Sequence, residues 1–136
     1  MKIVHLYTGD DGESHFRDIE LPMTTMMKAL AYEFPGVEGV QFRAIPKGLT
    51  LGFHTASRRQ LIVQLKGSGE IDCGNGEVRR FGATDYLLAD DRTGRGHISR
   101  EISGPREQLL VYISEAIQID QSGLGPASPV LRGDSL

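Results

Sequence analysis

The chain has 136 residues, enough for one domain with a buried core, and its 15 Lys and Arg against 18 Asp and Glu give a net charge of −3. Proteins that neutralise phosphates usually carry a basic stripe; the sequence has none, so we expect no nucleic-acid partner. No window approaches ~20 apolar residues and the first residues are polar, which predicts neither a membrane-spanning helix nor a signal peptide. We therefore expect a cytoplasmic protein. Its single cysteine, Cys73, is expected to be a small apolar core residue.

Apolar and polar residues alternate through most of the chain, which is the period of a β-strand. Turn-forming residues interrupt this alternation about every eight to twelve residues. The strands predicted in this way are 2–7, 15–21, 37–45, 49–55, 60–66, 70–73, 77–81, 86–89, 96–102 and 108–117. Many short strands at this spacing are typical of an all-β barrel or sandwich.

One segment has helical rather than strand spacing. Four apolar residues fall at i, i+3, i+4 and i+7: Met23, Met26, Met27 and Leu30. This predicts at most one short helix, near residues 23–33. From residue 120 the composition changes to Gly, Ser and Pro, so we expect a single domain at 1–119 and a tail at 120–136 that is flexible or packs on a partner chain.

Histidine and glutamine side chains stand at the ends of the predicted strands. His54 leaves one strand, Gln60 opens the next, and Gly67 follows after six intervening residues. This spacing resembles the first signature of the cupins, His-x-His, three or four residues, Glu, six residues, Gly. Gln60 stands where that signature has glutamate, and Ala56 stands where it has the second histidine. His97, at the start of a later strand, matches the histidine of the second cupin signature.

Three longer segments, Gly9 to Phe16, His54 to Gln60 and Asp90 to His97, are similar to a group of small single-domain bacterial cupins. The resemblance covers roughly residues 37–114. It implies an antiparallel double-stranded β-helix, that is, a jelly-roll or cupin barrel. Because one fold carries many activities, the function has to be argued from the site.

Side-chain direction supports a polar cavity independently of this resemblance, because residues two apart in a strand share a face. One set of polar faces is formed by Thr50, Gly52 and His54, and by Gln60, Ile62 and Gln64. The opposite faces, Leu49, Leu51 and Phe53, and Leu61, Val63 and Leu65, are expected to pack on a second sheet or another subunit. A polar interior is typical of a barrel that holds a small-molecule ligand.

Histidine acid–base chemistry on a small oxygenated metabolite, with no required cofactor, is the function that this cavity predicts. His54 would be the catalytic base, and His97 the catalytic acid or the partner that orients it. Isomerases, dehydratases and cyclases on the cupin fold work in this manner. The predicted substrate-binding residues are Gln60, Arg58, Tyr86 and Tyr112.

Two alternatives stay open. His54, Gln60 and His97 would be the ligands of a divalent metal (Fe, Mn, Zn or Ni) in a metal-dependent cupin, although an amide is a poor ligand and Ala56 removes a donor. The same cavity would also suit a non-catalytic metabolite-binding or sensor cupin.

The loop before His97 is expected to aim this histidine inward, with an Asp of the loop pairing with Arg58 or Arg59. His5 and His15 are interpreted as structural or solvent-facing. Apolar strand faces, the first hairpin and the tail favour a homodimer formed by sheet packing or strand exchange.

Overall fold

The computed structural model describes residues 1–120 and 123–124, and all regular structure in this part of the chain is β-strand. The all-β prediction is therefore confirmed. The strands are β1 Lys2–Thr8, β2 Ser14–Glu20, β3 Thr24–Met26, β4 Ala29–Ala31, β5 Val37–Ile45, β6 Leu51–His54, β7 Gln60–Cys73, β8 Val78–Phe81, β9 Tyr86–Asp90, β10 His97–Ile113, β11 Ile119–Asp120 and β12 Gly123–Leu124. The described residues contain no helix that is long and apolar enough to span a membrane.

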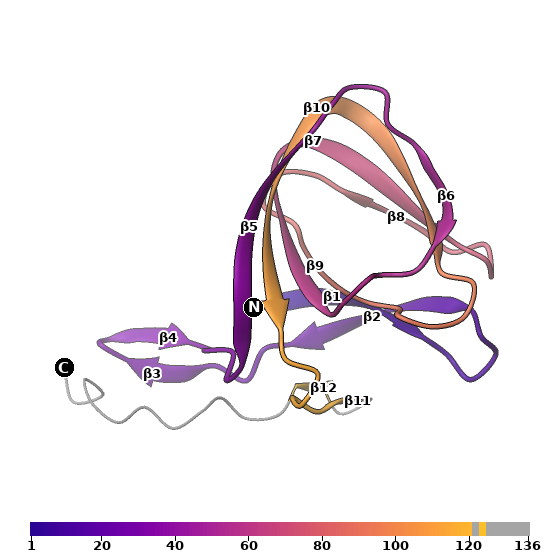
Figure 1. Ribbon diagram of the computed structural model, residues 1–136. Coiled ribbons are helices and arrows are strands. Elements are labelled where there is room, and N and C mark those ends of the chain that lie inside the picture. The colour runs from indigo at the N-terminus through magenta and orange to yellow at the C-terminus, as the bar shows by residue number, and fades with distance from the viewer. Residues whose placement is uncertain (121–122, 125–136) are drawn as a thin grey trace.

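Most strands belong to one mixed sheet that folds over on itself (Figure 1). The strand order is β2-β1-β9-β7-β10-β5, with β8 added to β7 and β6 added to β10. β1 and β9 are parallel, and the other pairs of this sheet are antiparallel.

The two long strands β7 and β10 join the two halves of the folded sheet. β7 pairs with β9 through residues 60–63 and with β8 through residues 69–72. β10 pairs with β6 near its start and with β5 near its end. Figure 1 shows β7 and β10 arching from one half to the other. The sequence pattern predicted each of them as two strands, because glycine-containing bends interrupt the alternation.

The core consists of two apolar clusters on opposite faces of the sheet. Adjacent residues of β9 show this, since Leu87 packs into one cluster and Leu88 into the other. Cys73 belongs to the same cluster as Leu87, and its burial raises the pKa of the thiol to about 12. The thiol is therefore neutral at physiological pH, as expected for a residue that fills the core.

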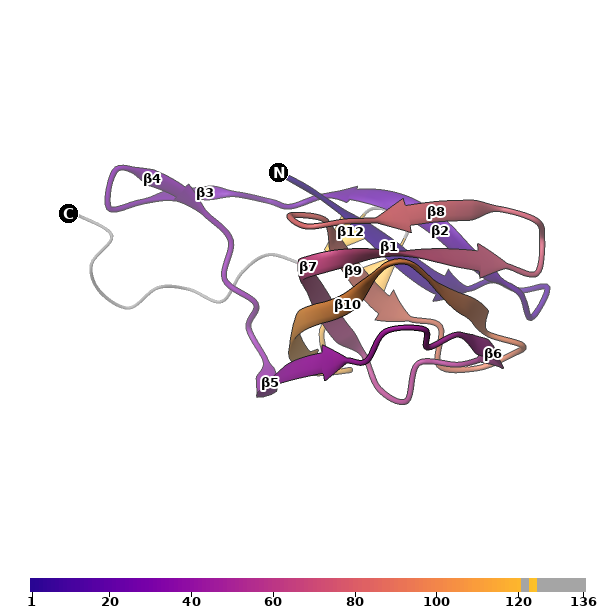
Figure 2. The same ribbon diagram turned by 90° about the horizontal axis from the view of Figure 1, so that it is seen from above.

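The helix predicted near residues 23–33 is wrong, because this segment is a β-hairpin formed by β3 and β4. Its turn residues, Met27 and Lys28, have φ of 49° and 63°, and a type I′ hairpin turn needs positive φ at both of these positions. The usual Asn-Gly signal for that turn is absent. Both views show the hairpin reaching away from the body of the sheet (Figures 1 and 2), so no surface is available to bury the apolar stripe of a helix.

Candidate functional site

The folded sheet encloses a cavity of about 330 Å³. Much of its wall is apolar, but several polar side chains also line it: His54, Gln60, Gln64, His97, Arg106 and Gln108. The structure thus brings three sequence-predicted residues, His54, Gln60 and His97, to one cavity. A mostly apolar pocket with a few convergent polar groups is the usual form of a small-molecule site.

His54 and His97 are direct cross-strand partners, one at the end of β6 and the other at the start of β10. Their ring centroids are 4.4 Å apart, and the ring planes are tilted by 55°. Gln60, the first residue of β7, is 9% exposed and His97 is 5% exposed. Both histidines can therefore act on the same small molecule.

A β-bulge in β6 determines which of its side chains face the cavity. His97 pairs with His54 while Ser99 pairs with Leu51, so β6 uses one more residue than β10 over this stretch. Leu51 and His54 consequently both line the cavity, as does Leu49. The expectation that Leu49 and Leu51 face away from His54 is therefore wrong, because simple alternation does not hold across a bulge.

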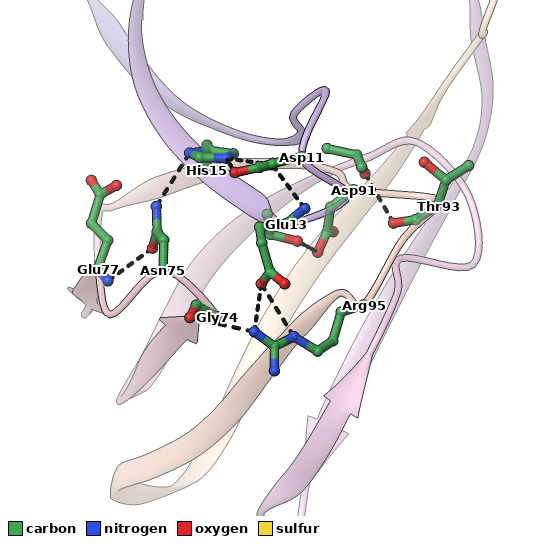
Figure 3. Close-up of polar contacts among 11 residues, drawn as sticks. Asp11, Glu13, His15, Gly74, Asn75, Glu77, Asp91, Thr93 and Arg95 are labelled. Carbon is green, nitrogen blue, oxygen red and sulfur yellow. Dashed lines mark hydrogen bonds and ion pairs between the residues drawn. The ribbon is translucent and has the colours of Figure 1, made fainter.

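The loop that leads into His97 is held by the loop between β1 and β2 and by the turn after β7. Arg95 donates to the Glu13 carboxylate, with an Nη2–Oε2 distance of 2.9 Å (Figure 3). The backbone N–H of Arg95 donates to the carbonyl oxygen of Gly12 at 3.0 Å. The Arg95 guanidinium also reaches the carbonyl oxygen of Gly74. Gly96 has φ of +79° and lies against the backbone of His54, where a side chain would not fit. These contacts fix where β10 begins, and with it the position of His97.

Asp91 supports His97 from behind the cavity wall. Nδ1 of His97 lies 2.5 Å from Oδ2 of Asp91, and the Ser14 hydroxyl donates to the same oxygen at 2.6 Å. The Asp91 side chain is fully buried, and its Oδ1 has no hydrogen-bond partner among the described residues. The contact leaves Nε2 as the free nitrogen of His97.

The sequence does not indicate this role of Asp91. It predicts that an Asp of this loop pairs with Arg58 or Arg59, and Asp90 does bind Arg59 with an Nε–Oδ1 distance of 3.0 Å. Adjacent residues of an extended chain point to opposite sides, so Asp90 and Asp91 cannot serve the same partner. This alternation indicates that the two carboxylates have different partners, but it does not reveal which histidine hydrogen-bonds to Asp91.

His54 is oriented by a different kind of acceptor. Its Nδ1 is 2.7 Å from the carbonyl oxygen of Gly52. Because a carbonyl oxygen only accepts hydrogen bonds, Nδ1 carries the proton, and in the neutral ring Nε2 carries the lone pair. No hydrogen bond joins Nε2 of His54 or of His97 to another described residue.

Three predicted substrate-binding residues lie outside the cavity lining: Arg58, Tyr86 and Tyr112. The Arg58 guanidinium stacks 3.8 Å from the ring centroid of Tyr112 and pairs with Glu38, so these groups hold one another. Tyr86 packs with the apolar cluster on the opposite face of the sheet. Arg106, Gln64 and Gln108 line the cavity instead. Arg106 and Gln108 are two residues apart on β10 and share its cavity face. The strands predicted from the sequence end at residue 102 and begin again at 108, so Arg106 falls between them.

The donor atoms of the cavity fit a tightly bound divalent metal poorly. Within the described residues, no cluster of three or more His, Cys, Asp or Glu side chains is placed to hold a metal ion. The carboxylate that contacts His97, Asp91, engages Nδ1 rather than the side of Nε2. Two imidazoles and the neutral amide oxygen of Gln60 make a weak ligand set for Fe, Mn, Zn or Ni.

Comparisons with protein-family models and with curated proteins found no match to this chain. The function is therefore inferred from the geometry and chemistry of the cavity.

Proposed function

We propose that this chain is a cupin-type jelly-roll protein that transfers protons on a small hydroxycarbonyl metabolite, as an isomerase or dehydratase does, without a required metal. The observation that carries the proposal is the pair of histidines in the cavity. Each ring has Nδ1 engaged by an acceptor, and no described residue hydrogen-bonds to its Nε2. Long strands shared by two halves of a folded sheet, together with the cupin-like spacing of His54, Gln60 and His97, support the fold assignment.

In the proposed resting state the two rings share one positive charge, because two imidazolium rings with centroids 4.4 Å apart repel each other. The neighbouring anion is Asp91, so the charge is placed on His97. His54 is then neutral, and its Nε2 lone pair makes it the general base.

The chemistry consists of two balanced proton transfers. His54 removes the proton from the carbon next to a carbonyl group, and Nε2–H of His97 protonates the carbonyl oxygen to give an enediol. His54 then returns its proton to the neighbouring carbon, and His97 takes one back from the neighbouring hydroxyl. The Gln60 amide, at the edge of the same cavity, donates a hydrogen bond to a substrate oxygen.

Hydrogen exchange at carbon tests this proposal. We expect the protein, pretreated with a chelator and placed in D₂O, to accelerate the loss of C–H signals from small hydroxyketones and hydroxyaldehydes in proton NMR spectra. His54→Gln and His97→Gln should each lower this rate by ~10²–10⁴-fold. His15→Gln is the matched control, because His15 hydrogen-bonds to Asp11 outside the cavity lining.

Two results would contradict the proposal. Exchange that appears only after iron, manganese, zinc or nickel is added would favour the metal-dependent alternative. Binding of these compounds with no exchange above the buffer rate would favour a non-catalytic binding protein.

We also propose that the chain forms a homodimer through an apolar sheet face. Val40 and Phe42 of β5 are 61% and 78% exposed, and β10 places Val111 and Leu109 directly opposite them. The β3–β4 hairpin also exposes an apolar side chain, Leu30, and an isolated two-stranded hairpin is marginally stable by itself. A second copy would cover the face and support the hairpin. The predicted tail lies largely outside the described residues.

Light scattering at micromolar concentration tests the dimer. The wild type should have twice the mass of the 14.9 kDa chain, and Phe42→Glu should shift it toward the monomer. Val78→Glu, which changes an exposed valine of β8, should leave the mass unchanged. A monomeric wild type would contradict this proposal.

A further inference from the structure

Arg106 is a buried cation that has no carboxylate partner among the described residues. Its side chain lines the cavity and is 7% exposed. It forms no ion pair with any described residue, and its hydrogen bond to the Leu49 carbonyl is long, at 3.3 Å. Its Nε is buried and has no hydrogen-bond partner among the described residues. Burying a charge in this way is costly unless something compensates it.

The backbone of β7 is shaped to admit this side chain. A Cβ atom at Gly67 would lie 2.8 Å from Cγ of Arg106, and one at Gly69 would lie 2.9 Å from Nη1. Gly67 also has φ of 75°, a conformation that favours glycine. The two glycines therefore leave room for the guanidinium to lie along the strand and reach the cavity.

The neighbouring polar groups do not neutralise Arg106. Gln64 and Gln108 bind each other, with Gln108 Nε2 donating to Gln64 Oε1 at 3.0 Å. Arg43, opposite Gln108 in the sheet, is a second arginine of the lining, and within the described part of the chain its hydrogen bonds go to Gln41. The single carboxylate of the described lining is Asp85, an exposed side chain whose Oδ2 accepts from the backbone of Gly82. This part of the cavity therefore carries an excess of positive charge.

We infer that Arg106 binds a carboxylate group of the small molecule held in the cavity. The planar guanidinium matches a carboxylate, and an anion there would offset the buried charge and give Nε an acceptor. A carboxylate fits better than a phosphate, because neither a helix N-terminus nor a glycine-rich turn of free amides among the described residues surrounds Arg106 to share a second negative charge.

The inference rests on the proposed function in one respect, which is the chemical group that the ligand presents to the two histidines. Arg106 and His97 are nine residues apart on β10 and line the same cavity from the two halves of the sheet. A carboxylate fixed at Arg106 would leave a carbonyl or hydroxyl group to face the histidines. The substrate class is then a small hydroxy or oxo carboxylic acid.

Equilibrium binding tests this without any turnover. Benzoate and benzamide have nearly the same shape and differ in charge, and their dissociation constants can be measured by calorimetry at constant ionic strength. We expect the wild type to prefer benzoate by about tenfold or more. Arg106→Gln should remove the preference, and Arg106→Lys should retain part of it.

Arg100→Gln is the matched control, because Arg100 lies on the same strand and pairs with Asp72 at 2.6 Å instead of lining the cavity. It should keep the benzoate preference. Equal affinity of the wild type for the two probes would overturn the inference, as would an unchanged preference in Arg106→Gln. The first comparison needs no variant and so does not depend on folding.

The two proposals can fail separately. Benzoate binding should survive His54→Gln, since that change leaves Arg106 in place. Wild-type protein that prefers benzoate but catalyses no C–H exchange would overturn the proton-transfer function alone. Protein that catalyses exchange but does not prefer benzoate would overturn the carboxylate site alone.

Discussion

Asp90 and Asp91 are adjacent in sequence, and each hydrogen-bonds to a buried histidine, yet the two pairs are chemically different. Asp90 contacts Nε2 of His5 at 2.9 Å, and Asp91 contacts Nδ1 of His97 at 2.5 Å. Because the chain is extended here, the two carboxylates point to opposite sides of the strand. Comparing them shows what separates a structural Asp–His pair from one that is able to do chemistry.

The His5–Asp90 pair is closed, in the sense that the protein itself binds both nitrogens of the histidine ring. Arg17 Nε donates to Nδ1 of His5, so both ring nitrogens are engaged. Burial lowers the pKa of His5, and the nearby Arg17 and Arg59 charges lower it further, although Asp90 opposes this. Burial alone would raise the pKa of Asp90, but hydrogen bonds from His5 and Arg59 bring it down to about 2. Both nitrogens of the His5 ring are bound by the protein, so the ring has none left for a ligand.

The His97–Asp91 pair is open, in the sense that the described residues bind only one nitrogen of the histidine ring. Asp91 binds Nδ1 of His97 and itself accepts a hydrogen bond from Ser14, and no described residue binds Nε2, which is left for the cavity. His54 lies next to it with the same free nitrogen. The difference between the two pairs is therefore the number of ring nitrogens that the protein itself satisfies.

Asp91→Asn should produce the largest effect on activity. An amide can keep the contact to Nδ1 of His97 but removes the charge that balances an imidazolium ring. We expect the rate of C–H exchange to fall by about 10³- to 10⁴-fold. NMR exchange rates measure this, and circular dichroism should show the variant still folded. If the exchange rate stays within a few-fold of the wild type, Asp91 has no role in the proposed chemistry.

Asp90→Asn should instead affect stability. It leaves the Arg59 guanidinium, which is 6% exposed, without its counter-charge. Breaking a buried ion pair from one side costs about 3–5 kcal/mol of the free energy of unfolding. Urea denaturation measures this, and the exchange rate per folded molecule should change little. A loss under about 1 kcal/mol would show that the pair contributes no more than a surface ion pair.

Asp90→Asn should also change how the free energy of unfolding depends on pH. The pKa of Asp90 in the folded protein, about 2, lies below its ordinary value of 3.8, so the unfolded chain takes up the proton first as the pH falls. The stabilisation is thus fully present above about pH 4 and is lost between pH 4 and 2. Asp90→Asn should flatten the stability curve in that window.

The sequence predicted most of the strands, because these follow from local alternation. It predicted a polar interior, whereas much of the cavity wall is apolar, since Leu49 and Leu51 line it. It placed His54, Gln60 and His97 together because their spacing resembles the cupin signatures. It failed where pairing between distant strands decides the outcome. The bulge in β6 exists only as a register shift against β10, and no local pattern reveals it.

The same limit applies to the charged residues. Asp90 and Asp91 are equivalent in sequence, and only the three-dimensional packing gives one of them Arg59 and the other Ser14. The turn at Met27 and Lys28 likewise has positive φ at residues that seldom adopt it, so the helical spacing of the methionines was misleading.

His5→Gln should give the smallest effect, and it tests whether the closed pair stays neutral. Glutamine keeps a donor for Asp90 and an acceptor for Arg17 but has no titrating ring. Because the pKa of folded His5 lies below 6.5, the unfolded chain binds a proton at this residue first as the pH falls through 6.5. Stability should therefore decline on acidification in the wild type, and less steeply in His5→Gln.

Denaturation curves at several pH values between 7 and 5 measure this difference. The slope of stability against pH should differ between the two proteins by at most one proton, which is about 1.4 kcal/mol per pH unit. The same curves for His97→Gln serve as a comparison. A change in the pH dependence of stability that appears in His97→Gln comes from the cavity pair and not from the His5–Asp90 pair. Identical slopes for the wild type and His5→Gln would mean that folded and unfolded His5 bind protons alike. The protein would then have to stabilise a charged ring at His5, and full satisfaction of its nitrogens would no longer explain why this pair differs from the pair at His97.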